Sequence, residues 1–235
     1  MDMRISNQSI IDEWSEFSKE DLIAFSDDGD SDRVSLLDPN IISLAGEIKG
    51  RRVLDAGCGN GYLSRKLAML GAVVTGVEPS NNLFRYCSEK EREAPLGITY
   101  MQCDLSKMEL NEEYDLVVLI NVLMDIPEYQ TALVNCIKVL KPGGEVIISI
   151  LHPCFPGSES DWKNTGYVQV REYFDAPPIK QKYGYLITRP IQDYFNVLIE
   201  NSCVIQRVIE PRQLGGSRNA HVPQFLMIKA KKSIE

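Results

Sequence analysis

The sequence lacks the features that mark secreted, membrane and metal-binding proteins. The first residues contain no long apolar stretch, and no apolar run in the 235 residues approaches the length that crosses a bilayer. The six cysteines form no C-x-x-C pair, and there are only two histidines. We therefore expect a cytoplasmic protein with reduced, mostly buried thiols, and we expect no zinc or other metal site.

Positive charge is also scarce. The chain has 25 Lys and Arg against 33 Asp and Glu, which gives a formal net charge of −8. Nucleic-acid-binding proteins usually carry a basic patch, because phosphate contacts supply much of their affinity. The basic residues here are scattered, except for three lysines within residues 229–232. The charge pattern therefore favours a small-molecule substrate over a nucleic-acid partner.

The hydrophobic pattern is typical of a single globular α/β domain. Hydrophobic residues make up 44% of the chain, which is enough for a large core. Apolar strand-like segments alternate with amphipathic helix-like segments, and this alternation predicts a parallel sheet with helices on both faces. We predict strands at residues 52–56, 72–77, 98–103, 114–120, 145–151, 203–210 and 224–229. We predict helices that start near Gly61 and Ser80, and others at residues 128–140 and 190–201.

We expect the first part of the chain, residues 1–50, to form a helical cap. Helix-like patterns occupy residues 10–25 and 37–48, and the second should end at Gly50. The acidic segment between them, residues 27–32, lacks the fixed ligand spacing of a calcium loop, so we interpret it as a solvated loop.

The remaining residues, 51–235, form the main domain in this interpretation, with an insertion at about residues 154–188. The insertion holds seven of the nineteen aromatic residues. An aromatic segment beside the strand ends suggests an apolar lid over a substrate. The alternative is that these side chains only attach the insertion to the core.

The most specific motif is the run from Val53 to Gly61, which is a buried strand followed by a glycine turn. Glycines occupy the alternate positions 57, 59 and 61, and a backbone without Cβ atoms can bend sharply and lie close to a ligand. The helix that opens after the turn offers free N–H groups to a polar ligand. Glu78 ends the next strand, where its carboxylate can accept both hydroxyls of a ribose. Together these features predict an adenosine-binding site.

Polar side chains also end the other predicted strands. Asp55, Glu78, Asp104 and Asn121 all lie at or just after carboxyl ends of strands. In an open parallel sheet, ligands bind outside these ends, where the strand order reverses. We therefore expect the four side chains to surround one pocket.

The spacing of the glycines separates the possible cofactors. The motif reads G-x-G-x-G and follows Asp55, whereas dinucleotide-binding turns read G-x-G-x-x-G and phosphate loops end in Gly-Lys-Ser/Thr. In this respect the chain resembles the class I S-adenosylmethionine-dependent methyltransferases, and the resemblance covers roughly residues 50–232. It rests on five segments in the same order: residues 55–61, 76–80, 103–105, 114–121 and 140–144.

The resemblance implies both a fold and a cofactor. The fold would be a Rossmann-like, seven-stranded, mostly parallel sheet with helices on both faces and an antiparallel last strand. The cofactor would be S-adenosyl-L-methionine, and the acceptor a small molecule. Independently of the resemblance, we expect a monomer or homodimer. By resemblance, the cofactor-binding residues are Asp55, Gly57, Cys58, Gly59, Gly61, Glu78, Pro79, Asp104, Leu105 and Asn121.

Candidates for chemistry are few. His152 follows the strand at 145–151, where it is either a base or substrate-orienting residue or a structural histidine that holds the insertion. Cys154 follows a proline as in cytosine-C5 methyltransferases, but after the wrong strand, so we favour an unreactive thiol.

Three further side chains have two interpretations each. Asn121 is either a ligand contact or a turn residue. For Asp125 the resemblance also implies a contact with the methionine part of the cofactor or with the substrate, but we favour a helix N-terminal residue. For Arg33 we favour an exposed loop arginine over a partner of the cofactor carboxylate.

Two other functions remain open from the sequence. One is a module that binds S-adenosylmethionine or S-adenosylhomocysteine without catalysis, as a sensor or partner subunit. The other is a nucleotide-dependent oxidoreductase on a similar sheet.

Overall fold

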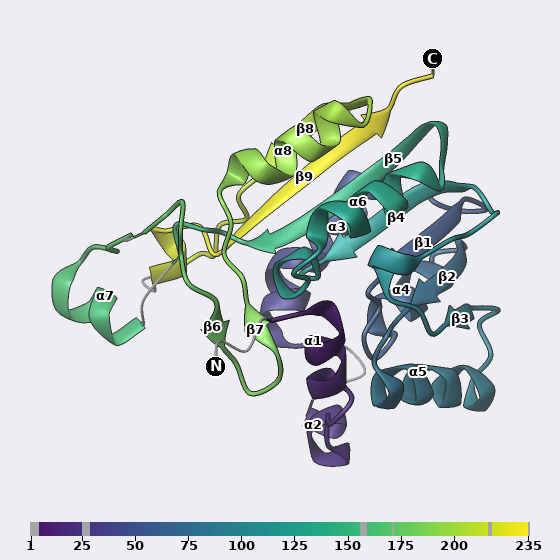
Figure 1. Cartoon of the computed structure of the whole chain (residues 1–235), viewed down its shortest axis with the longest axis horizontal. Coiled ribbons are helices and arrows are strands. Elements are labelled where there is room, and N and C mark those ends of the chain that lie inside the picture. Colours follow the sequence, from purple (N-terminus) through teal and green to yellow (C-terminus); the bar gives the residue numbers. More distant parts are fainter. Residues whose placement is uncertain (1–4, 25–28, 156–158, 171, 216–217, 235) are drawn as a thin grey trace.

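A twisted seven-stranded sheet forms the centre of the protein (Figure 1). The computed structural model describes residues 5–24, 29–155, 159–170, 172–215 and 218–234. The strands are β1 (Arg52–Ala56), β2 (Val73–Val77), β3 (Thr99–Met101), β4 (Tyr114–Ile120), β5 (Leu140–Leu151), β8 (Cys203–Ile209) and β9 (Phe225–Lys232). They lie in the order β3-β2-β1-β4-β5-β9-β8, and β9 runs opposite to the other six strands. The predicted seven-stranded Rossmann-like fold is therefore confirmed.

Both faces of the sheet are covered by helices, because the central strands are apolar on both sides. In β4, Val117 and Leu119 face one core cluster, whereas Leu116 and Val118 face the other. The first cluster includes α6 (Tyr129–Lys138) and α8 (Ile191–Glu200), and the second includes α3 (Asp38–Ala45) and α4 (Tyr62–Met69). Helix α5 (Asn81–Glu93) follows β2 beside the edge strand β3. Among the helices of the described residues, none is long and apolar enough to cross a membrane.

The N-terminal cap differs in detail from the prediction. The expected single helix at 10–25 is two helices, α1 (Asn7–Trp14) and α2 (Lys19–Ala24), and residue 25 lies outside the described residues. The break has a local cause, since the hydroxyl of Ser18 accepts a hydrogen bond from the Asp21 amide at 3.1 Å and caps the second helix. A π-helical turn, η1 (Arg33–Leu37), precedes α3. Helix α3 ends at Gly46, with φ of 66°, and not at Gly50 as expected.

The insertion contains a short helix, α7 (Glu159–Thr165), and a two-stranded hairpin of β6 (Ile179–Lys180) and β7 (Tyr185–Leu186). The hairpin lies next to the N-terminal helices (Figure 1). Its Tyr183 ring packs 4.7 Å from the Phe17 ring, centroid to centroid, and its hydroxyl lies 2.5 Å from the Asp21 carboxylate. The described part of the insertion therefore supports the cap. The division into cap, main domain and lid remains a prediction.

Three short 3-10 turns complete the elements of the described residues: η2 (Leu105–Lys107), η3 (Leu123–Asp125) and η4 (Arg218–Ala220). The first two follow β3 and β4, at the carboxyl edge of the sheet. They place the loops that carry Asp104 and Asp125 at the same edge as the glycine turn.

Candidate functional site

A cavity lies where the carboxyl ends of β1, β2 and β4 meet helix α1. Nine of the ten predicted cofactor residues line it. The exception is Gly61, which packs beneath the turn, where an added Cβ would lie 2.5 Å from the Tyr100 hydroxyl. The structure therefore brings the predicted residues together, and their binding roles remain predictions.

Two glycines of the turn have different environments. Gly57 and Gly59 both have positive φ, 77° and 57°. A Cβ on Gly57 would lie 2.6 Å from both methyl carbons of Val122, whereas a Cβ on Gly59 would meet no heavy atom within 4 Å. Because Gly59 lines the cavity, its bare backbone leaves room there for a ligand to approach closely.

Glu78 is a buried carboxylate held in place by backbone N–H groups. One of its oxygens accepts from the Ser80 amide at 2.8 Å, and the other accepts from the Gly59 amide at 3.0 Å. Burial raises the pKa of Glu78 to about 7, although both backbone hydrogen bonds oppose the rise. A carboxylate oxygen has a second lone pair, so Glu78 retains the capacity to accept two hydroxyl donors.

Asp55 and Arg33 place opposite charges on one cavity. Asp55 is buried and accepts from the Ser64 hydroxyl at 2.6 Å. Burial raises the pKa of Asp55 to about 6, and the Ser64 hydrogen bond and the positive charge of Arg33 both limit the rise. The side chain of Arg33 is only 25% exposed, so the expectation of an exposed loop arginine is wrong. An anion and a cation at one end of a cavity suit the ammonium and carboxylate groups of an amino acid.

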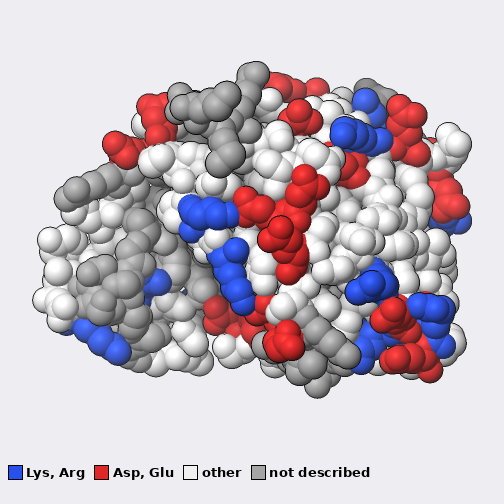
Figure 2. All heavy atoms as spheres, turned by 60° about the horizontal axis from the view of Figure 1, so that its bottom comes forward, with Lys and Arg blue, Asp and Glu red and all other residues white. Residues whose placement is uncertain are grey.

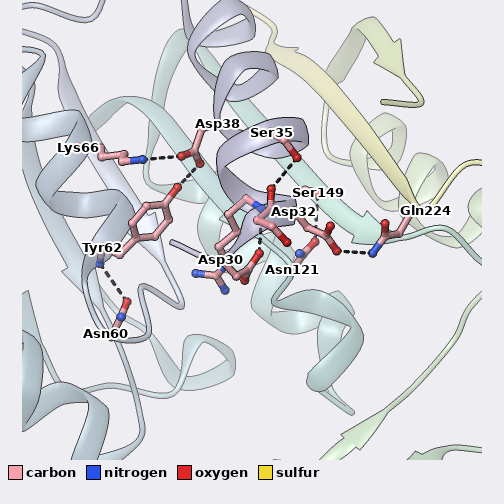
Figure 3. Close-up of polar contacts among 12 residues, drawn as sticks. Asp30, Asp32, Ser35, Asp38, Asn60, Tyr62, Lys66, Asn121, Ser149 and Gln224 are labelled. Carbon is pink, nitrogen blue, oxygen red and sulfur yellow. Dashed lines mark hydrogen bonds and ion pairs between the residues drawn. The ribbon is translucent and has the colours of Figure 1, made fainter. Parts of the chain in front are cut away.

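A buried polar network holds the cap turn against the glycine-turn helix (Figure 3). Asp38 accepts from the Tyr62 hydroxyl and from Lys66, whose Nζ lies 2.7 Å from the carboxylate. The guanidinium of Arg33 lies 5.5 Å from the centroid of the Tyr62 ring. This network links η1 and α3 to α4, and it positions Arg33 at the cavity.

Asn121 ends β4 in a left-handed conformation, with φ of 56°. Its amide donates to the Ser149 carbonyl at 2.8 Å, and its side-chain oxygen accepts from the Ser149 hydroxyl at 3.0 Å (Figure 3). Asparagine tolerates this conformation better than most residues. The residue is therefore both a turn residue and part of the cavity wall, so its two interpretations do not exclude each other.

Helix α1 supplies cavity residues that the sequence analysis did not identify. They are Asn7, Ile10, Ile11 and Trp14, and Phe17 follows them. Asn7 connects α1 to two loops, because its Nδ2 lies 3.3 Å from Asp104 and 2.9 Å from the Ser106 hydroxyl, and its oxygen accepts from the Glu128 amide. The helix periodicity predicted a buried face, but it carried no information about which surface that face covers.

Asp125 also lines the cavity. It is the last residue of η3, and α6 begins only at Tyr129, so the interpretation as a helix N-terminal residue is wrong. The sequence pattern was misleading because a 3-10 turn and five further residues separate the strand from the helix.

His152 and Cys154 are not among the cavity-lining residues of the described chain. The Nδ1 of His152 accepts from the Cys154 amide at 3.0 Å, so its Nε2 carries the proton and donates to Glu210 at 3.0 Å. Burial lowers the pKa of His152, and the Glu210 carboxylate opposes this effect. Both ring nitrogens are engaged, which favours the structural interpretation, and a role as base remains a prediction. Of the described residues between 154 and 188, none lines the cavity.

The polar groups that line the cavity fit the cofactor that the resemblance implies. Glu78 suits a ribose diol, Asp104 suits an amino group on an adenine, and Asp55 with Arg33 suits an amino-acid end. Gly59 lies between Asp55 and Glu78 in the sequence, and the space beside its backbone leaves room for the ligand.

Comparison with known proteins gives the same fold. Residues 54–148 match the family model "Methyltransferase domain". A curated "Ubiquinone biosynthesis O-methyltransferase" from Coxiella burnetii is 34% identical over 109 residues, which is 46% of this chain and 47% of that protein. The chain thus spans about half the length of the curated relatives it matches.

Solved structures align over more of the chain. An S-adenosylmethionine-dependent methyltransferase from Mesorhizobium loti aligns with a TM-score of 0.71 and 22% identity, and covers 88% of this chain and 100% of that one. Magnesium protoporphyrin IX methyltransferase from Synechocystis, with bound S-adenosylmethionine, aligns with a TM-score of 0.66 and 19% identity over 99% and 100% of the two chains. At these identities the match establishes the fold.

Proposed function

We propose that this chain, which carries a methyltransferase domain of the class I fold, transfers a methyl group from S-adenosyl-L-methionine to a small-molecule acceptor. The observation that carries the proposal is the convergence of Glu78, Asp55 and Arg33 on one cavity beside the open face of Gly59. These are the groups that a nucleoside joined to an amino acid requires.

Each end of the cofactor has a partner in this proposal. Glu78 accepts the two ribose hydroxyls, and Asp104 accepts from the adenine amino group. Asp55 accepts from the ammonium of the methionine part, and the guanidinium of Arg33 pairs with its carboxylate. Ile11 and Trp14 line the cavity from α1 and give it an apolar side.

The cofactor, when bound, supplies an already activated methyl group on its sulfonium. The protein therefore needs mainly to hold the acceptor in line with that methyl group, and correct positioning alone lowers the barrier by up to about 7–11 kcal/mol. Asn121 and Val122 follow directly at the end of β4 on the cavity wall, where Val122 lies against Gly57, and they can position the reacting groups.

Two observations support a small-molecule acceptor. On the face shown in Figure 2, basic and acidic side chains are interspersed, and the visible described residues form no extended basic patch. The aligned relatives are also named for ubiquinone biosynthesis and for magnesium protoporphyrin IX. A cytoplasmic location and a monomeric or homodimeric state remain predictions.

The proposal is tested by incubating the purified protein with methyl-labelled S-adenosylmethionine and a metabolite extract. We expect a labelled product and the release of S-adenosylhomocysteine. Tight binding of S-adenosylhomocysteine without any labelled product would instead identify a non-catalytic binding module. Binding of NAD in place of S-adenosylhomocysteine would identify an oxidoreductase.

A further inference from the structure

Asp125 lies in the loop after β4, and its side chain forms no hydrogen bond or ion pair with the described residues. Its amide donates to the Val122 carbonyl at 2.9 Å, and this bond closes the η3 turn. Its carboxylate is half-buried, lines the cavity and has no hydrogen-bond partner among the described residues. A carboxylate on a cavity wall that has no protein partner is free to accept a hydrogen bond from a ligand in that cavity.

The loop that carries Asp125 is fixed from behind by Arg189. This buried guanidinium donates to the carbonyls of Leu123 at 2.8 Å and Ile126 at 2.7 Å, and lies 4.1 Å from the centroid of the Tyr129 ring. The Ile187 amide, from the end of the insertion, donates to the Met124 carbonyl at 2.8 Å. The loop that carries Asp125 is thus held by hydrogen bonds from outside it, which suits a group that acts on a ligand.

The cavity wall next to Asp125 is apolar. Val122, Ile126 and Pro127 line it on the same loop, and Ile11 lines it from the cap. The other charged residues that line the cavity in the described chain are Arg33, Asp38, Asp55, Glu78 and Asp104, and the charge behind Asp125 is Arg189. Burial raises the pKa of Asp125 to about 7, and the charge of Arg189 opposes the rise.

We propose, on the basis of the proposed function, that Asp125 is the general base of the transfer and that the acceptor is a molecule whose attacking oxygen or nitrogen carries a proton. This assignment separates two tasks, because Glu78, Asp104, Asp55 and Arg33 hold the cofactor and Asp125 faces the acceptor. It also gives the apolar wall a role, since that wall contacts the carbon skeleton of the acceptor.

The proton and electron balance of the step is simple. A lone pair of the acceptor oxygen or nitrogen forms a bond to the methyl carbon, while the bond from that carbon to sulfur breaks and its electron pair remains on sulfur. The proton of the acceptor passes to the Asp125 carboxylate and then to solvent. A base whose pKa lies near the working pH is suited to this transfer, and such a base typically contributes about 10²–10⁴-fold in rate.

The first test needs no acceptor. Protein labelled with ¹³C at the aspartate carboxyl carbons is titrated by NMR, and the Asp125 signal is assigned as the one that disappears in Asp125→Asn. We expect an apparent pKa near neutrality, in line with the raised value of about 7. An apparent pKa near the ordinary value of about 4 would overturn the proposal.

The second test compares labelled methyl transfer into the metabolite extract. Asp125→Asn should lose about 10²-fold or more of the activity and lose the rise of rate through neutral pH, while its affinity for S-adenosylhomocysteine stays unchanged. Asp125→Glu should recover part of the activity. Glu128→Gln is the control, because this exposed carboxylate lies three residues further along the chain.

The two proposals fail in different ways. If wild type transfers the label and Asp125→Asn transfers it equally well with the same pH profile, the base assignment is wrong and the proposed function stands. If wild type binds S-adenosylhomocysteine and transfers no label to any compound, the proposed function fails, and the assignment of Asp125 fails with it.

Discussion

At the scale of single residues, Gly57 and Gly59 have the same sign of φ but different reasons to be glycine. An alanine at either position adopts a left-handed conformation, which costs about 1–2 kcal/mol. At Gly57 the new methyl group also lies 2.6 Å from Val122, whereas at Gly59 it points into open space. We therefore expect Gly57→Ala to unfold at a lower temperature than Gly59→Ala.

Binding should separate these two variants further. Gly59→Ala should remain folded but lose most of its affinity for S-adenosylhomocysteine in isothermal titration, because the methyl group occupies the space left for the ligand. If a folded Gly59→Ala protein bound S-adenosylhomocysteine with wild-type affinity, the ligand would not lie against Gly59 as we propose.

Glu78 makes the stability of the ligand-free protein depend on pH. Its pKa is about 7 when folded, against an ordinary value of 4.5. As the pH rises between these values, the unfolded chain releases its proton first, so the free energy of unfolding falls. Glu78→Gln removes this titration. In urea denaturation between about pH 5 and about pH 8, wild type should lose up to about 3 kcal/mol relative to the variant. If the free energies of unfolding of the two proteins changed in parallel with pH, the pKa of Glu78 would not be raised in the folded state.

The residues that the sequence analysis misjudged share a physical cause. Arg33 and Asp125 lie in segments without regular periodicity, where sequence gives side-chain chemistry but not direction. Their places depend on tertiary contacts, namely the packing of Arg33 beside Tyr62 and the Arg189 bonds to the loop of Asp125. By contrast, Asp55 and Glu78 were predictable because they directly follow buried apolar strand residues, and strand ends converge in a parallel sheet.

At the scale of elements, the insertion hairpin supports the cap helix that covers the cavity. Tyr183 packs against the rings of Trp14 and Phe17, and its hydroxyl bonds to Asp21. Such ring pairs contribute about 0.5–1.5 kcal/mol beyond the buried area. Tyr183→Ala should therefore increase amide hydrogen exchange in α1 and weaken the binding of S-adenosylhomocysteine.

Two matched variants make this test specific. Tyr183→Phe keeps the ring and should retain most of the protection of α1, whereas Tyr167→Ala removes a tyrosine that is 62% exposed and should change nothing. Equal protection of α1 in Tyr183→Ala and wild type would show that the hairpin does not support the cap.

The elements that sequence predicted well are those with strong local signals. The strands β1 and β4 have the predicted boundaries, because each is an apolar run between polar residues or a glycine turn. The strand β5 begins five residues earlier than expected, at Leu140 and not at residue 145, since Leu140 pairs with Tyr114 before the glycines. The cap was predicted as one helix because its apolar periodicity continues through Ser15 and Ser18, whose side-chain hydrogen bonds end one helix and begin the next.

At the scale of the whole molecule, the cavity has walls from parts of the chain that are far apart in sequence. The cap contributes Asn7 and Trp14, the sheet contributes Asp55 and Glu78, and the loop after β4 contributes Asp125. Asn7 already links the cap to the loops that follow β3 and η3 through its hydrogen bonds to Asp104 and to the Glu128 amide. A ligand in the cavity therefore contacts both the cap and the sheet, and binds only when they are assembled.

This coupling gives a prediction for thermal unfolding. A ligand that binds only the folded state stabilises it by about 2.7 kcal/mol at a hundredfold excess over Kd. In a Trp162→Phe variant, fluorescence reports on Trp14 in the cap and circular dichroism reports on the whole fold. S-adenosylhomocysteine should raise both melting temperatures together, and NAD should raise neither. A rise in the circular dichroism transition alone would place the ligand away from the cap, because a ligand that bridges the cap and the strand ends cannot stabilise one without the other.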